Sequence, residues 1–78
     1  MPRYLFNILE NSLSKEKIRE QLPNALAARR RAQEMARELG RRPANALHAP
    51  SLVIDVTDES RQQICVVLVR RQDRATAA

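Results

Sequence analysis

One helix is marked at both ends by the residues around it. Leu22-Pro23-Asn24 precedes it, and Asn24 is a good N-cap because its side-chain oxygen can accept an unpaired backbone N–H of the first turn. Gly40 stands where a helix C-cap favours a left-handed residue, and Pro43 stops any continuation. The sequence therefore predicts a helix over residues 24–39.

The predicted helix has one narrow apolar face. Helical spacing places six residues on it: Ala25, Ala28, Ala32, Met35, Ala36 and Leu39. Alanine lets a helix lie close to a sheet but removes little apolar surface from water. The strands must therefore supply most of the core.

Strand patterns lie on both sides of this helix. Residues 3–9 alternate, with Tyr4, Phe6 and Ile8 on one face. Residues 52–56 and 64–69 predict a hairpin with its turn at 58–61. The second arm is apolar on both faces, which is typical of a central strand covered on both sides. Because one helix covers one side only, we expect another copy of the protein to cover part of the other.

The segment between the first strand and the helix is ambiguous. Residues 11–22 are polar, and Ser14 to Glu20 could form a helical turn or a loose connection. The predicted fold is α+β, with a β-α-β-β order, a three-stranded, mainly antiparallel sheet and one main helix packed on one face. Residues 1–70 are expected to form a single domain, and residues 71–78 a frayed tail.

Few residues are suited to site chemistry. The 78 residues include one cysteine, Cys65, and one histidine, His48, which excludes an internal disulfide and a zinc site built from several Cys and His. Self-association is the remaining means of stabilising so small a domain. His48 lacks a partner cue, Cys65 reads as a small buried hydrophobe, and the acidic cluster at residues 55–59 reads as a solvated turn. We therefore predict no catalytic, cofactor-binding or metal residues, and no enzyme.

The charge pattern offers one sharper hypothesis. The net charge is +5, and the excess of positive charge lies in residues 11–42, which contain nine basic residues and four glutamates. Five residues are candidate nucleic-acid contacts: Arg30, Arg37 and Arg41 along one helix stripe, assisted by Lys15 and Lys17. Alternatively, Glu34 and Glu38 stand at ion-pair spacing from those arginines and could leave an ordinary solvated face.

Three motifs carry a resemblance to a known family. They are the opening Met-Pro-Arg-Tyr-Leu-Phe-Asn-Ile, the step Leu22-Pro23-Asn24 into an Ala/Arg-rich helix, and Ile54-Asp55-Val56-Thr57-Asp58-Glu59. In order and spacing, the chain resembles a family of short, uncharacterised proteobacterial proteins that begin Met-Pro-Arg-Tyr-Phe-Phe, a domain of unknown function. The resemblance implies a β-α-β-β layout and no activity. In the family a glycine-containing turn follows the first strand, and the acidic stretch after it can pair as an extra strand. Both are replaced here, which makes a helical turn at 14–20 more plausible and leaves helix, strand and loop open for residues 11–22.

The sequence thus predicts a small non-catalytic interaction module that forms a homodimer or binds another protein. Nucleic-acid binding through the arginine-rich helix face is the alternative, and a small-ligand enzyme is the least favoured. No segment is long and apolar enough for a membrane span, and no signal peptide is recognised. A cytoplasmic bacterial protein without cofactors is expected.

Overall fold

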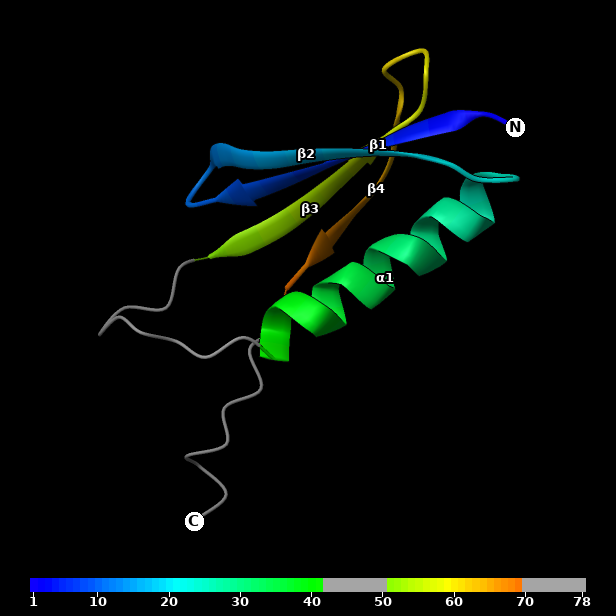
Figure 1. Cartoon of the computed structure of the whole chain (residues 1–78). Helices are drawn as coiled ribbons and strands as arrows, with labels where there is room; N and C mark the ends of the chain where they lie inside the picture. The colour runs from blue at the N-terminus through cyan, green and yellow to red at the C-terminus, as the bar shows by residue number, and fades with distance from the viewer. Residues whose placement is uncertain (42–50, 70–78) are drawn as a thin grey trace.

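The computed structural model describes residues 1–41 and 51–69. They form, in chain order, β1 (Arg3–Glu10), β2 (Leu13–Gln21), α1 (Ala25–Arg41), β3 (Leu52–Thr57) and β4 (Gln63–Leu68). The strands make one antiparallel sheet in the order β2-β1-β3-β4, and α1 lies along one face of it (Figure 1). The α+β class and the position of the helix are as predicted. Pro43, His48 and the tail at 71–78 lie outside the described residues.

The prediction of three strands is wrong, because residues 13–21 form a fourth strand instead of a helical turn or a loose connection. β2 pairs with β1 from Arg3 opposite Gln21 to Glu10 opposite Leu13. The two-residue turn between them, Asn11 and Ser12, has φ values of 52° and 71°, the backbone of a type I′ hairpin. A glycine is therefore not required here: strand pairing holds two non-glycine residues in the left-handed region.

The first hairpin is also tied to the start of β3. Asn11 donates its backbone N–H to the Ser51 carbonyl oxygen at 2.9 Å, and the Ser51 N–H donates to Asn11 Oδ1 at 3.1 Å. This reciprocal pair brings together segments that are 40 residues apart in the chain. It sets the side of β1 on which β3 begins.

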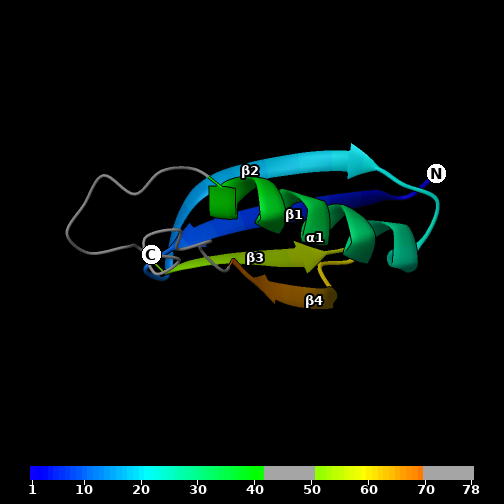
Figure 2. The same cartoon turned by 90° about the horizontal axis from the view of Figure 1, so that it is seen from below.

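The core lies between the sheet and α1, and Figure 2, seen from below, shows the helix lying across the face of the strands. Tyr4, Phe6 and Ile8 of β1 are buried, as predicted, and they meet Ile54 and Val56 of β3. Phe6, Ile54 and Val56 are the largest fully buried side chains. The two central strands therefore supply most of the apolar surface that folding removes from water.

The helix begins as predicted. Asn24 Oδ1 accepts the backbone N–H of Ala27 at 2.9 Å, which confirms the N-cap. At the other end the prediction is wrong: α1 continues through Gly40, which is helical and buried rather than a left-handed cap. Four small residues at four-residue spacing form a buried ridge: Ala28, Ala32, Ala36 and Gly40. A glycine on this ridge lets the last turn approach the sheet closely.

The second hairpin is formed as predicted, but the position of its second arm is not. β4 is an edge strand, paired with β3 on one side only, rather than a central strand. Its side chains alternate between Cys65 and Val67, which pack against the core, and Val66 and Leu68, which are 49% and 67% exposed. The second apolar face of β4, formed by Val66 and Leu68, is therefore not covered within the monomer.

Candidate functional site

The two edges of the sheet differ in chemistry. β2, at one edge, carries Lys15, Glu16, Lys17, Arg19 and Glu20 within nine residues. β4, at the other, reads Gln-Ile-Cys-Val-Val-Leu, with no charge and no proline. Charged side chains, lysine above all, protect an edge strand against pairing with other chains, whereas an apolar edge invites it. The edge of β4 is therefore the candidate interaction site.

The backbone of β4 leaves hydrogen-bonding groups at this edge. Val69 donates its N–H to the Leu52 carbonyl oxygen of β3 at 3.0 Å. Alternate residues of an antiparallel strand bond to the same neighbour, so the N–H and C=O groups of Val66 and Leu68 point away from β3. Those groups have no partner strand in the four-stranded sheet. An added strand would find them already in line.

An apolar row extends inward from this edge on the sheet face opposite α1. Leu9 of β1 lies opposite Val53 of β3, and Val53 lies opposite Leu68 of β4. Leu9 and Val53 are half-buried, whereas Leu68 is mostly exposed. Toward β2 the same face becomes polar, because Asn7 and Lys17 are neighbours there. The apolar surface thus gathers on the β4 side.

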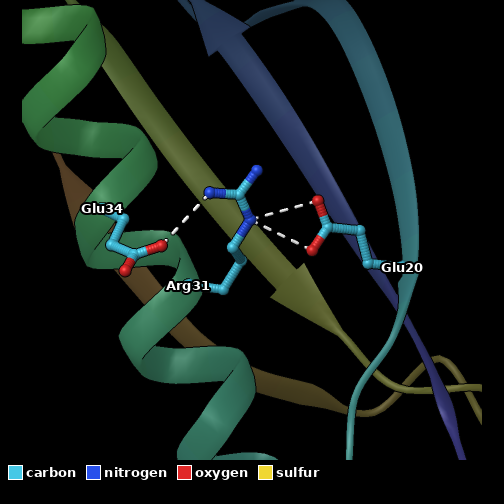
Figure 3. Close-up of polar contacts among 3 residues, drawn as sticks. All are labelled: Glu20, Arg31 and Glu34. Carbon is cyan, nitrogen blue, oxygen red and sulfur yellow. Dashed lines mark hydrogen bonds and ion pairs between the residues drawn. The ribbon is translucent and has the colours of Figure 1, made fainter.

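Arg31 links the helix to β2, the charged edge strand of the sheet (Figure 3). Its Nε donates to both carboxylate oxygens of Glu20 on β2, at 3.0 and 3.1 Å, and its Nη1 donates to Glu34 at 3.2 Å. The hydrogen bonds to Glu20 raise the pKa of the Arg31 guanidinium, although partial desolvation opposes them. This contact holds α1 against β2 and engages Arg31, which is therefore not a free phosphate ligand.

The three arginines of the predicted stripe remain on the outer surface of α1. Arg30, Arg37 and Arg41 are all exposed. Glu34 contacts Arg31 rather than Arg30 or Arg37, and within residues 1–41 and 51–69 no ion pair at 4.0 Å or less joins the stripe to a carboxylate. Among the described residues, the stripe therefore lacks the neutralising ion pairs that helical spacing suggested, and Glu34 pairs with Arg31 instead.

The two lysines that were expected to assist are not beside that stripe. Ile18 and Glu20 of β2 face the helix, so Lys17, which is adjacent to Ile18 in the chain and lies opposite Asn7 of β1, projects from the other face of the sheet. Lys15 contacts Glu10 at 3.3 Å, next to the register shift between β1 and β2. The structure therefore brings Arg30, Arg37 and Arg41 together and separates Lys17 from them.

The remaining reactive groups are dispersed. Cys65 is a free thiol, partly buried against the core rather than fully buried. In the part of the chain that the structure describes, no group of three or more His, Cys, Asp or Glu side chains could hold a metal ion. Nor does that part contain a helix with the length and apolar character that a bilayer crossing needs.

A family model described as a domain of unknown function, DUF6894, matches residues 3–70. The chain belongs to this family. The match runs from β1 to just beyond β4, so it covers the whole sheet and the helix. No curated protein and no solved structure shows significant similarity to the chain.

The open edge was missed at the sequence level, although its signal was present. The apolar run from Ile64 to Val69 predicts a strand with two apolar faces, and its Val66 and Leu68 side chains are exposed. The charged run from Lys15 to Glu20, however, was not recognised as the opposite edge of the same sheet. A charged strand at one edge of a sheet and an apolar strand at the other together indicate that the apolar edge is the one open to pairing.

Proposed function

We propose that this protein is a small, non-catalytic interaction module that self-associates through β4. Two β4 strands pair antiparallel about a two-fold axis and join the two four-stranded sheets into one continuous sheet. Both copies of α1 then lie on the same face of that sheet. The single observation that supports the proposal is the uncharged, half-exposed edge of β4, at the opposite end of the sheet from the charged edge at β2.

A second copy suits this edge for a physical reason. The ridge of α1 is alanine and glycine, so the monomer buries little helix surface, and a chain this short has a small core to draw on. Covering Leu68 and Val66 would add up to about 1.5–3 kcal/mol for each side chain that becomes fully buried. Strand pairing would also satisfy the outward backbone groups.

Salt should affect this association in a characteristic way. Arg29 and Gln33 flank the buried ridge on the side opposite Arg31, which is the side of β4. In the paired sheet, these flanks of the two helices approach one another with like charges. Salt should therefore strengthen the dimer by screening that repulsion, whereas it weakens binding to a phosphate backbone.

The experiment compares two leucine-to-lysine substitutions by sedimentation equilibrium and by the concentration dependence of Tm. Leu68→Lys places a charge on the β4 edge and should yield a monomer. Leu13→Lys is the matched control, since Leu13 is 70% exposed against 67% for Leu68 but lies at the β2 edge. The control should dimerise like the wild type. A wild-type Tm that does not change with protein concentration, or equal disruption by both substitutions, would refute the proposal.

Nucleic-acid binding by the exposed Arg30, Arg37 and Arg41 is the second candidate, supported by the lack of carboxylate contacts to them among the described residues. An NMR titration with a short DNA duplex in roughly 150 mM salt tests it, because loose charge attraction is screened there. Shifts confined to those arginines and their neighbours would favour it. The free thiol of Cys65 supports the further proposal of a cytoplasmic setting, and the resemblance of the motif Met-Pro-Arg-Tyr-Leu-Phe to a proteobacterial family supports a bacterial source.

A further inference from the structure

Three arginines from three separate elements line one pocket. Arg3 comes from β1, Arg19 from β2 and Arg61 from the turn between β3 and β4. The pocket has a volume of about 280 Å³. Its remaining lining residues are Tyr4, Leu5, Thr57, Asp58 and Glu59. We call it the arginine pocket, and it lies on β1, β2 and the turn rather than at the β4 edge.

The turn holds Arg61 in an unusual backbone conformation. Its φ is 65°, in the left-handed region that favours glycine. Asp58 fixes the turn: its carbonyl oxygen accepts the Arg61 N–H at 3.0 Å, and its Oδ1 accepts the N–H groups of Ser60 and Gln62 at 2.8 and 2.9 Å. A non-glycine residue in this conformation carries a backbone cost, which makes its side chain a candidate for a functional role.

The pocket is electrostatically unbalanced toward positive charge. Of its two carboxylates, Asp58 already accepts hydrogen bonds from the turn backbone through Oδ1. Among residues 1–41 and 51–69, no carboxylate lies within 4.0 Å of the charged nitrogens of Arg3, Arg19 or Arg61. Three arginines and two carboxylates thus leave this concave site with a formal excess of one positive charge.

From this arrangement we infer that the arginine pocket binds a phosphoryl group, as in a pyrophosphate or a phosphate ester. The planar guanidinium donates paired hydrogen bonds that match phosphate oxygens, and arginine keeps its charge at all physiological pH values. A tetrahedral dianion can accept from three directions, which suits donors arriving from β1, β2 and the turn. The hydroxyl of Thr57, in the same lining, supplies a further donor.

The test is an NMR titration of the full chain with sodium pyrophosphate, followed at the backbone amides of residues 57–62 and of β1. Saturable shifts at those positions are expected. Arg61→Gly is the decisive variant, because glycine relieves the left-handed backbone while removing the guanidinium. It should keep a Tm at or above that of the wild type and weaken binding about tenfold or more.

Two further variants sharpen the result. Glu59→Gln removes the opposing charge and should tighten pyrophosphate binding about two- to fivefold. Arg37→Ala, on the outer surface of α1, is the control and should bind like the wild type. In a parallel titration, a short oligonucleotide that binds more tightly than pyrophosphate at the same amides would identify the phosphate source as nucleic acid, and weaker binding would identify a free phosphate compound. No saturable shifts, or equal losses in Arg61→Gly and Arg37→Ala, would overturn the inference.

Discussion

The turn between β1 and β2 makes a quantitative prediction for Ser12→Gly. Ser12 has a φ of 71° at the second position of a type I′ turn, where glycine is favoured. The left-handed region costs a non-glycine residue about 1–2 kcal/mol. Glycine in turn loses about 0.4–1 kcal/mol through the greater freedom of the unfolded chain. The net effect is a gain of about 0.5–1 kcal/mol in the free energy of unfolding.

This gain is measurable by thermal unfolding. In a domain of this size, 1 kcal/mol shifts Tm by about 4–8 °C, so Ser12→Gly should raise Tm by about 2–8 °C at a fixed protein concentration. Circular dichroism and differential scanning calorimetry both report it. Because Ser12 lies in the turn before β2, at the opposite side of the sheet from β4, the substitution should not change self-association.

Asn11→Gly is the matched control. Asn11 also has a positive φ, 52°, but asparagine tolerates it, and its Oδ1 accepts the Ser51 N–H. Glycine there removes that hydrogen bond, so Tm should fall or stay level. An unchanged or lower Tm for Ser12→Gly would contradict the type I′ turn. If residues 14–20 formed a helical turn instead, glycine at position 12 would not raise the stability.

Two further predictions concern α1. Asn24→Ala removes the acceptor for the Ala27 N–H and should cost about 1 kcal/mol of stability, seen as a lower denaturant midpoint with an unchanged m-value. Ala32→Leu overfills a fully buried site on the ridge of small residues and should cost about 1–3 kcal/mol of stability in the same assay. Ala25→Leu, at an exposed site, is the control and should change the stability little. Equal effects of the two substitutions would show that the ridge does not pack closely on the sheet.

Local signals account for the elements that were predicted correctly. Asn24 caps α1 because the interaction of its side chain with the first turn is confined to four residues, and the alternation of Tyr4, Phe6 and Ile8 reports the buried face of β1 directly. The Leu52 and Ile64 arms are joined by a short turn, so their pairing also needs no distant information. Of the five candidate contacts, Arg30, Arg37 and Arg41 share the exposed surface of α1, as helical spacing predicts, whereas Lys15 and Lys17 lie on β2.

The errors fall where a distant partner decides the outcome. Residues 13–21 are polar enough to be a helical turn, and only the backbone of β1 beside them makes them a strand. Gly40 has the residue type of a cap, but it lies buried in the last turn of α1 with a helical backbone. Lys17 and Arg30 both belong to the basic segment, yet the alternation of β2 sends Lys17 to the opposite face of the sheet.

The amino-acid sequence alone determined the composition of the core, the start of α1, the second hairpin and the absence of an internal disulfide. These properties depend on residue type and on neighbours a few positions away. Only the tertiary structure decided that β1 and β3 are central, that β4 is an open apolar edge and that Arg3, Arg19 and Arg61 share one pocket. Strand order depends on which segments pair across the sheet. Strands pair through backbone hydrogen bonds, which do not depend on side-chain type, so the sequence does not reveal the order.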